Sequence, residues 1–254
     1  MRLSDKVAII TGAGAGIGEA TAIRFAEEGA HLVLADLNEA NATAVVEKVQ
    51  AAGGEAIAVR ADISKEEDAR RISDAAVARF GRIDILVNNA ADFTQRAVED
   101  ATLADWHRVF GVNVAGTAMV SKYAIPHMQA AGGGAIVNIS SKSGIIAQPK
   151  FATYNSSKGA IIILTRCMAL DLAPFNIRVN TVCPGTIYTT ATEREWTRFG
   201  ETREQWTARE APPIMLKRIG EAREVANAIL FLASDEASFI TATDLLVDGG
   251  YVAQ

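Results

Sequence analysis

Short apolar segments recur along the chain and alternate with longer stretches of helical periodicity. The short segments are apolar at nearly every position, as in Ile83-Asp84-Ile85-Leu86-Val87, which is typical of strands buried on both faces of a parallel sheet. The strands that we predict are seven in number: Lys6–Thr11, His31–Ala35, Ala56–Arg60, Ile83–Val87, Ala135–Ser140, Arg178–Val182 and Leu245–Val247.

The longer stretches have the apolar spacing of helices, and Gly or Asn lies near several of their ends. The helices that we predict are Gly16–Glu28, Asn38–Ala52, Lys65–Phe80, Thr102–Ala130, Thr153–Ala173 and Ala222–Ala233. Such alternation predicts an α/β fold, a doubly wound Rossmann-type domain whose parallel sheet has helices on both faces.

One segment, residues 189–216, does not fit a strand. It carries Trp196, Trp206 and several charged residues, and it ends near Pro212-Pro213. We predict that it forms a small, mobile helical lid over a substrate site.

Composition limits the class of protein. The chain has 254 residues, 49% of them hydrophobic, with no compositional break, which predicts one catalytic domain over residues 1–254. The net charge of −5 is spread over interspersed acids and bases, which excludes a basic nucleic-acid surface. No apolar run approaches the roughly 18 residues of a membrane span, and the first residues lack the apolar core of a signal peptide. We expect a cytoplasmic protein with no membrane partner.

The cysteines and histidines are scattered. Cys167 and Cys183 form no Cys-x-x-Cys motif, and we expect both to be buried reduced thiols. His31, His107 and His127 have no partner at metal-ligand spacing, so we expect no metal site.

A glycine-rich turn follows the first predicted strand, in Thr11-Gly12-Ala13-Gly14-Ala15-Gly16-Ile17-Gly18. The common G-x-G-x-x-G pattern is absent. The spacing assigns Gly12 to the turn, Gly16 to backbone approach to phosphate and Gly18 to packing of helix on strand. Amides at the helix N-terminus would then face a pyrophosphate. A flexible loop is the alternative, and glycines placed at a strand-to-helix junction disfavour it. We therefore predict a dinucleotide site.

Asp36 ends the second predicted strand, about 20 residues beyond the turn, where a carboxylate can accept hydrogen bonds from ribose hydroxyls. It would repel a 2′-phosphate, no arginine immediately precedes it, and Leu37-Asn38 is uncharged. NAD is favoured over NADP. An isolated aspartate at this point could equally be a helix cap, so the assignment depends on the glycine turn.

Tyr154 and Lys158 are spaced i, i+4 on a predicted helix, and Ser141 lies thirteen residues before Tyr154. An ammonium on the same helix face favours the phenolate, so we expect a Tyr154 pKa below its ordinary value of about 10. Such a phenol can exchange a proton in the interconversion of alcohol and ketone. An ordinary amphipathic pair is the alternative, and the glycine turn favours the catalytic interpretation.

With these motifs in order, the chain resembles the short-chain dehydrogenases/reductases from Lys6 to the C-terminus. The other segments that carry the resemblance are Asp62-Ile63, Asn88-Asn89-Ala90, Asn113, Ile139-Ser140-Ser141, Pro184-Gly185 and Val247-Asp248-Gly249-Gly250. Asn88 by itself could be only a turn former at the end of its strand.

The resemblance implies a role for each matching residue. Tyr154 would exchange the proton, Ser141 rather than Ser140 would bind the substrate oxygen, Lys158 would also bind the nicotinamide ribose, and Asn113 would support a water reaching Lys158. Hydride would pass between nicotinamide C4 and the carbinol carbon. The cofactor would be held by the glycine turn with Gly12, Gly16, Ile17 and Gly18, and by Asp36 at the adenosine ribose. Asp62 and Ile63 would border the adenine, and Asn89, next to Ala90, would contact the ribose side. Pro184, Gly185, Ile187 and Thr189 would hold the nicotinamide, and Tyr154 and Lys158 would also contact the cofactor. Cationic NAD would favour the phenolate further, so oxidation should improve on the alkaline side.

Two positions depart from the family pattern. Ala91 replaces a glycine after Asn-Asn-Ala, and Ala242 replaces a glycine after the C-terminal Ile-Thr. If a positive φ is needed there, each methyl group has a cost. We expect a small local shift with cofactor binding retained.

The candidate substrate residues are polar with aromatic walls. They are Ser143, Gln148, Lys150 and Phe151, then Asp92, Phe93 and Gln95, and in the lid Trp196, Arg198, Trp206 and Arg209. This set suits a sugar, a polyol or a hydroxy acid, whose carboxylate an arginine could clamp. Simple surface exposure of the same charges is the alternative.

Three functions remain open. The first is an NAD-dependent secondary-alcohol dehydrogenase for a small polar substrate, the second an NADPH-dependent 3-oxoacyl thioester reductase, which Asp36 disfavours. The third is a non-catalytic dinucleotide-binding sensor, which has no need of Tyr154 and Lys158. Apolar residues on several helix faces, such as Ile161–Leu164, together with the resemblance, predict a homotetramer.

Overall fold

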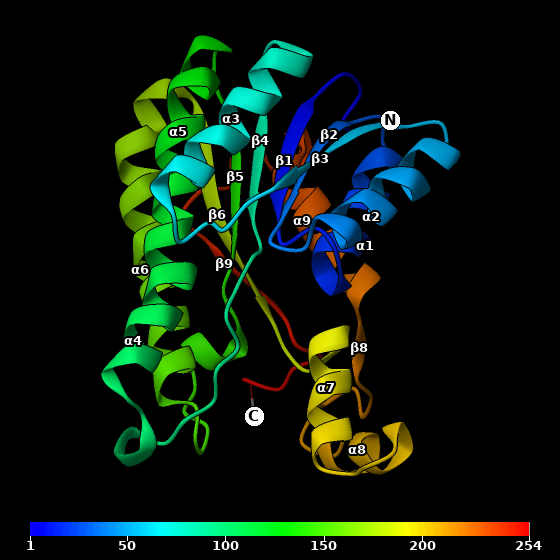
Figure 1. Cartoon of the computed structure of the whole chain (residues 1–254), viewed down its shortest axis with the longest axis vertical. Helices are drawn as coiled ribbons and strands as arrows, with labels where there is room; N and C mark the ends of the chain where they lie inside the picture. Colours follow the sequence, from blue (N-terminus) through cyan, green and yellow to red (C-terminus); the bar gives the residue numbers. More distant parts are fainter. Residues whose placement is uncertain (254) are drawn as a thin grey trace.

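The computed structural model describes residues 1–253. At its centre is a parallel sheet with the strand order β3-β2-β1-β4-β5-β6-β9 (Figure 1). Its seven strands are β1 (Val7–Thr11), β2 (His31–Asp36), β3 (Glu55–Arg60), β4 (Ile85–Asn88), β5 (Gly134–Ile139), β6 (Ile177–Pro184) and β9 (Asp244–Val247). The predicted doubly wound α/β fold is confirmed, with strand ends shifted by one or two residues.

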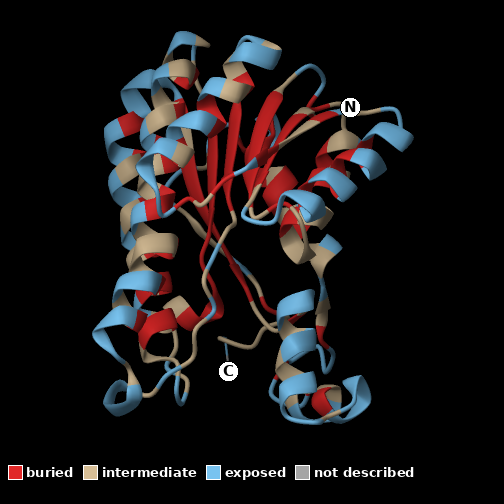
Figure 2. Ribbon diagram, in the orientation of Figure 1, coloured by how far each residue is buried: buried red, intermediate tan, exposed pale blue. Residues whose placement is uncertain are grey.

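Helices cover both faces of the sheet (Figure 1). Those on one face are α1 (Gly16–Ala26), α2 (Glu39–Ala51) and α9 (Ala222–Ala233), and those on the other are α3 (Glu66–Phe80), α4 (Leu103–Phe110), α5 (Thr117–Ala130) and α6 (Ala152–Leu172). Successive strand residues point to opposite faces, so Ile10 and Leu34 pack under α1 and α9 while Ile9 and Val33 pack under α3 and α5. The central strands β1, β2, β4 and β5 are mostly apolar because both of their faces are buried (Figure 2).

The helix predicted over Thr102–Ala130 is confirmed as α4 and α5, which continue into each other through a π-helical turn at Gly111–Gly116. The π-helical turn was not predicted. Gly116 packs directly on the chain after β3, since a Cβ at this position would lie 2.9 Å from the Ile63 carbonyl oxygen. The wider turn carries Asn113 into the interior, where 2% of its surface is exposed.

The strand order reverses between β1 and β4, and this point positions the ligand crevice of doubly wound sheets. The backbone N–H groups of Asn89 and Ala90 both donate to the Thr11 hydroxyl, each at 3.1 Å. These bonds hold the segment after β4 against the glycine turn after β1. Two of the predicted motifs therefore meet at one edge of the sheet.

The segment predicted as a lid contains two helices, α7 (Thr190–Arg198) and α8 (Arg203–Glu210). A two-stranded ribbon, β7 (Ile187–Tyr188) with β8 (Gly220–Glu221), connects it to the body and was not predicted. Figure 1 shows α7 and α8 standing apart from α4 and α6. The lid has its own apolar cluster, built around Trp206 with Ala211, Ile214 and Ile219, on which Tyr188, Trp196 and Tyr251 pack.

Cys183 is buried as expected, but the prediction of a buried thiol at Cys167 is wrong. Cys167 lies on the outer face of α6, where Ile163 is 56% exposed and Leu170 is 78% exposed. The spacing of these three residues makes one exposed apolar stripe along the helix.

The two alanines that replace family glycines differ in conformation. Ala242 has φ +61°, a left-handed value at which a Cβ costs roughly 1–2 kcal/mol, while its N–H donates to the Val179 carbonyl at 2.8 Å. Ala91 does not have a positive φ, so its methyl group causes no such strain.

In residues 1–253, none of the helices combines the length and apolar character needed to span a bilayer.

Candidate active site

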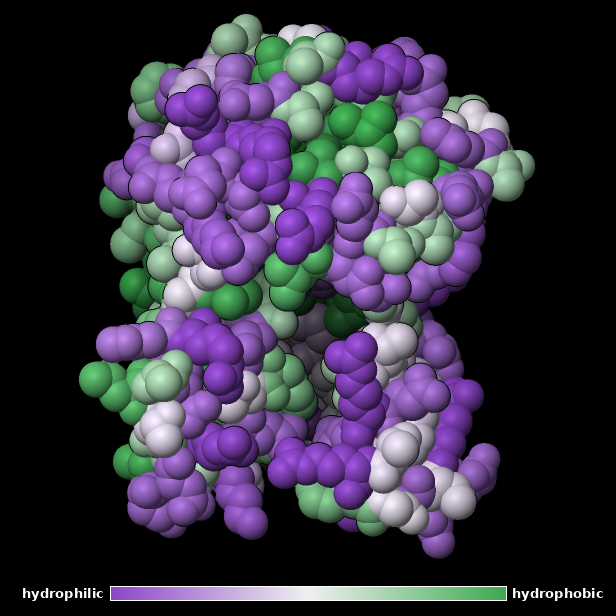
Figure 3. Space-filling view, viewed as in Figure 1, coloured by the Kyte–Doolittle hydropathy of each residue, from purple (hydrophilic) through white to green (hydrophobic). Residues whose placement is uncertain are grey.

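A cavity of about 1610 Å³ lies between the carboxyl ends of the strands and the lid. It extends from Asp36 past the glycine turn to Tyr154 and on to Trp206 of α8. Figure 3 shows the hollow between the lid and the opposite lobe. A pocket for one small molecule measures roughly 300–1,000 Å³, so this cavity has room for a dinucleotide and a substrate together.

The glycine turn forms a cradle that side chains would fill. Gly12 has φ +63°, and a Cβ there would lie 2.8 Å from the Cα of Ala90. A Cβ at Gly18 would lie 2.1 Å from the Gly12 carbonyl oxygen, so only glycine lets α1 start this close to the turn. No side chain caps the N-terminus of α1 in residues 1–253, and its first residues line the cavity. The free amides suit a phosphate group.

Asp36 lies at the end of β2 on the cavity wall. Its carboxylate accepts the N–H of Gly14 at 2.9 Å and that of Asn38 at 2.8 Å. These bonds hold the carboxylate against the glycine turn. Arg60, its partner across β2 and β3, also lines the cavity, a cation that the sequence argument did not consider because it lies on another strand.

Tyr154 and Lys158 lie on the first turns of α6, with 8% and 3% of their surfaces exposed. The Ser141 side chain is hydrogen-bonded to Tyr154, whereas the Ser140 hydroxyl donates to the Lys158 carbonyl at 2.8 Å. Of the two neighbouring serines, therefore, Ser141 faces the phenol and Ser140 anchors the loop to α6.

The expected lowering of the Tyr154 pKa by Lys158 is not found. Burial raises the pKa of Tyr154, and the hydrogen bond from Ser141 only partly opposes this. Lys158 Nζ donates to the Ile139 carbonyl at 2.8 Å and lies 5.6 Å from the centre of the Tyr154 ring. Burial lowers the pKa of Lys158 to about 8. Desolvation is the largest cause of the pKa change in both groups.

Comparison with known proteins agrees with this geometry. A family model described as enoyl-(acyl carrier protein) reductase matches residues 12–252. Meso-2,3-butanediol dehydrogenase of Serratia marcescens is 41% identical over 255 residues, 100% of this chain and 97% of that protein. Cyclopentanol dehydrogenase of a Comamonas species is 38% identical over 252 residues, 99% of each. The solved structure of 7α-hydroxysteroid dehydrogenase, complexed with NADH and 7-oxoglycochenodeoxycholic acid, superposes with a TM-score of 0.91 at 40% identity and covers 100% of this chain and 96% of that one.

The chain belongs to the short-chain dehydrogenase/reductase family. Relatives that act on secondary alcohols support an alcohol/ketone oxidoreductase. The positions assigned by the family resemblance can now be located on the cavity wall.

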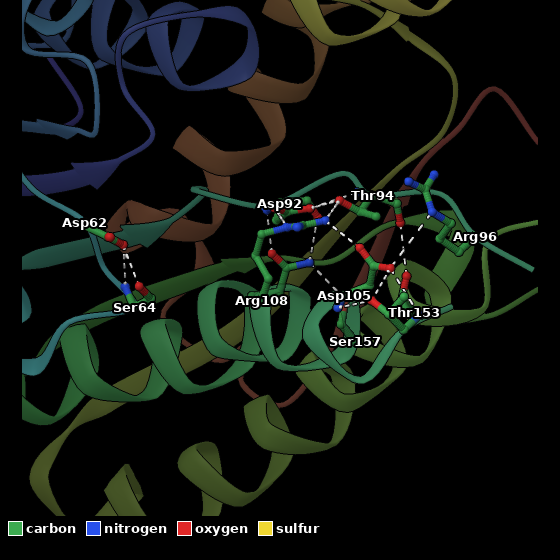
Figure 4. A network of polar contacts seen from close by, with 11 residues as sticks. Asp62, Ser64, Asp92, Thr94, Arg96, Asp105, Arg108, Thr153 and Ser157 are labelled. Atoms are coloured by element: carbon green, nitrogen blue, oxygen red, sulfur yellow. Dashed lines mark hydrogen bonds and ion pairs between the residues drawn. The ribbon is translucent and has the colours of Figure 1, made fainter. Parts of the chain in front are cut away.

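Most of the predicted cofactor residues line the cavity of this short-chain dehydrogenase/reductase. They are Gly12, Gly16, Ile17, Asp36, Asn89, Ala90, Tyr154, Lys158, Pro184, Gly185, Ile187 and Thr189. Gly18 lies behind the turn. Asp62 and Ile63 do not line the cavity. The Asp62 carboxylate accepts a hydrogen bond from the Ser64 hydroxyl at 2.6 Å (Figure 4). Ile63 packs on Gly116. Asn88 is no turn former but a buried residue that donates to Asn138 Oδ1 at 2.8 Å.

Asn113 braces the segment after β4 through hydrogen bonds to Asp92, which Figure 4 labels. Its side-chain oxygen accepts the N–H of Asp92 at 2.7 Å, and its amide group donates to the Asp92 carbonyl at 3.1 Å and to the Ser157 hydroxyl at 2.9 Å. The Asp92 carboxylate is bound by Arg108 at 3.0 Å and does not line the cavity. Asn113 thereby links this segment to α6, which carries Tyr154.

Among the candidate substrate residues, Ser143, Gln148 and Phe93 line the cavity. The Phe93 ring meets that of Tyr154 edge-on, with centroids 4.6 Å apart. Trp196 does not line the cavity, because its ring packs on Trp206 inside the lid at 5.1 Å. Of the other candidates, Phe151, Trp206 and Arg209 line the cavity, while Lys150, Gln95 and Arg198 do not.

The cavity residues that the sequence argument missed include Lys142, Glu195, Glu210 and Tyr251. Lys142 directly follows Ser141, and Tyr251 follows the Gly249-Gly250 motif, so closeness to a motif was a usable signal for both. Nothing in the sequence indicated the two glutamates. In residues 1–253, no group of three or more His, Cys, Asp or Glu side chains could hold a metal ion.

The pKa of Lys158 predicts an effect on stability. With a folded-state pKa of about 8 and an unfolded value near 10.4, the unfolded chain binds more protons between these pH values. The free energy of unfolding should therefore rise as pH rises through this window, and at pH 7 the buried ammonium should cost up to about 3 kcal/mol. Lys158→Met should be more stable at pH 7 and lack the rise, as measured by urea unfolding at pH 7 and pH 10. Lys122→Met, which changes an exposed lysine, is the control. A lower free energy of unfolding at pH 7 for Lys158→Met than for the wild type would contradict the prediction.

Proposed function

We propose that this short-chain dehydrogenase/reductase is an NAD-dependent dehydrogenase that interconverts a secondary alcohol and a ketone on a small, polar substrate. The observation that carries the proposal is one continuous cavity lined at one end by Asp36 and the glycine turn and at the other by Ser141, Tyr154 and Lys158. A binding module has no need of the second group of residues.

The cradle at Gly12 and the uncapped N-terminus of α1 fit the pyrophosphate of a dinucleotide. Asp36 would hold the adenosine ribose, Lys158 the nicotinamide ribose, and Pro184 and Gly185 the nicotinamide end. When bound, the nicotinamide dinucleotide supplies or accepts the hydride.

The chain supplies position and one proton. Ser141 would donate to the carbonyl oxygen of a ketone, and the Tyr154 hydroxyl would donate its proton to the same oxygen as the alcohol forms. In the reverse direction the phenolate form of Tyr154 would take the alcohol proton. Because burial raises the pKa of Tyr154, this residue is protonated and ready to donate at neutral pH. Phe93 and Phe151 line the cavity, and their rings pack against each other and, for Phe93, against that of Tyr154.

NAD is supported by Asp36 and by the NADH bound in the related 7α-hydroxysteroid dehydrogenase. The relatives that act on butanediol and cyclopentanol support a small alcohol. One observation favours the second candidate, an NADPH-dependent 3-oxoacyl thioester reductase: Arg60 lies beside Asp36 and could bind a 2′-phosphate. The carboxylate of Asp36, fixed toward the glycine turn, opposes it.

A homotetramer in the cytoplasm remains our prediction. The exposed stripe of Ile163, Cys167 and Leu170 on α6 supports association, because it leaves apolar surface for another copy to cover.

A substrate panel tests the proposed function. The purified chain is given NAD or NADP with sugars, polyols, hydroxy acids and 3-hydroxyacyl thioesters, and the absorbance of the reduced cofactor is followed. We expect turnover with NAD on a small hydroxy compound. Turnover of thioesters alone with NADP would replace this function by the second candidate, and no turnover in any class would favour the sensor.

A further inference from the structure

A lysine lies in the substrate end of the cavity, directly after Ser141. Only 5% of the Lys142 surface is exposed. Its Nζ donates to the Thr186 hydroxyl at 2.9 Å and lies 3.5 Å from the centre of the Tyr251 ring. It forms no ion pair with any residue of the described chain, 1–253. An ammonium has three N–H groups, so Lys142 retains donors for a further partner.

A carboxylate on the lid lines the same cavity. Glu195 of α7 is half-buried and makes no side-chain hydrogen bond or ion pair within residues 1–253. Burial, together with neighbouring Glu210, raises its pKa. Glu210, by contrast, is bound by Arg209, which also pairs with Glu201 at 2.9 Å. Among these carboxylates, Glu195 is the one with acceptor oxygens still to be satisfied.

We propose that Lys142 and Glu195 form a subsite for a hydroxyl group of an uncharged, hydroxylated substrate, a diol or polyol, at a carbon away from the one that reacts. This inference rests on the proposed function and names its substrate class. The reason is chemical: Lys142 can only donate and ionised Glu195 can only accept, while a hydroxyl group does both. A hydroxylated substrate in this cavity can therefore satisfy the free donors of Lys142 and the free acceptors of Glu195.

The charges around the subsite disfavour the other two substrate types. A substrate carboxylate would pair with Lys142 but would also face Glu195 and Glu210, and Arg209 is already engaged by two glutamates. A hydrocarbon at this position would leave a buried ammonium and a carboxylate without partners, which is strongly unfavourable. A neutral polar group avoids both costs, and Trp206 and Tyr251 provide apolar surface for its carbon skeleton.

A matched substrate series tests the subsite. Cyclohexanol, the isomeric cyclohexanediols and 4-hydroxycyclohexanecarboxylate share the reacting carbinol and differ only in the remote group. With NAD, we expect kcat/KM for the best diol to exceed that for cyclohexanol by about 10-fold or more, the effect of one hydrogen bond to a charged group. Lys142→Met should remove most of this preference by lowering kcat/KM for the diol, while kcat/KM for cyclohexanol should not fall, because the unpaired buried ammonium is removed. Glu195→Gln should raise kcat/KM for the carboxylate substrate.

The controls are Lys150→Met, in a neighbouring loop, and Glu193→Gln, on the same helix as Glu195. Neither side chain lines the cavity, and neither change should alter the ratios. An unchanged diol preference in Lys142→Met overturns the inference, as does a preferred carboxylate substrate whose turnover Lys142→Met abolishes. Cyclohexanol turnover by the wild type reports on the proposed function separately. If no substrate is turned over, calorimetry with the NAD-loaded protein decides: diol binding weakened in Lys142→Met supports the subsite, and no diol binding refutes it.

Discussion

Replacing Tyr154 by phenylalanine should lower kcat by about 10²–10⁴-fold and change the affinity for NADH by less than about 2-fold. The hydroxyl is the group that exchanges the proton, and Ser141 is hydrogen-bonded to it. The ring itself packs against Phe93, and these contacts persist in phenylalanine. The loss should therefore fall on the chemical step. Steady-state kinetics and fluorescence titration with NADH measure the two effects.

Tyr123→Phe is the matched control for this variant. Its hydroxyl donates to Glu66 at 2.7 Å on the outside of α5, far from the cavity wall. Kinetics of this variant should equal those of the wild type. Turnover retained in Tyr154→Phe would remove Tyr154 from the mechanism, and an equal loss in both variants would show that the effect is not specific to the site.

The double variant Asp36→Ala/Leu37→Arg should shift the ratio of NADPH to NADH affinity toward NADPH by about 100-fold. The change removes a carboxylate that would face a 2′-phosphate and adds a guanidinium that can bind it, each contribution being roughly 1.5 kcal/mol or more. Leu37 is 63% exposed and lines the cavity, so an arginine fits there without repacking the core. Fluorescence titration with both reduced cofactors measures the ratio.

Two single variants separate the causes of that shift. Asp36→Asn removes the charge but retains an acceptor for the Gly14 N–H. If NADH binding is weaker in the double variant and not in Asp36→Asn, the cause is the loss of this hydrogen bond to the glycine turn. Arg60→Gln should leave the wild-type preference unchanged. Tighter binding of NADPH than NADH by the wild type, lost in Arg60→Gln, would show that Arg60 and not Asp36 sets the cofactor choice.

Local pattern predicted much of this fold. A strand buried on both faces is apolar at nearly every position, and Ile83–Val87 shows this pattern, with Asp84 as its one polar residue, without any knowledge of its neighbours. The long helix predicted over Thr102–Ala130 is present, but apolar periodicity did not indicate the π-helical turn at Gly111–Gly116, where Gly116 packs on Ile63. This wider turn carries Asn113 into the interior.

Protonation could not be predicted in the same way. The i, i+4 spacing correctly placed Tyr154 and Lys158 together on α6. The expected direction of the Tyr154 pKa was wrong, because spacing describes the neighbouring charge but not the removal of water, and burial is the largest cause of the change in both pKa values.

By itself the sequence determined the alternation of strands and helices, the glycine turn and the helix that carries Tyr154 and Lys158. These follow from residues close together along the chain, whose backbone geometry restricts them directly. Only the tertiary structure decided that Arg60 lies beside Asp36, that Trp196 packs inside the lid, and that Lys142 and Glu195 line the same cavity. Those pairs come from different elements, and they meet only because burial of the apolar faces brings the elements together.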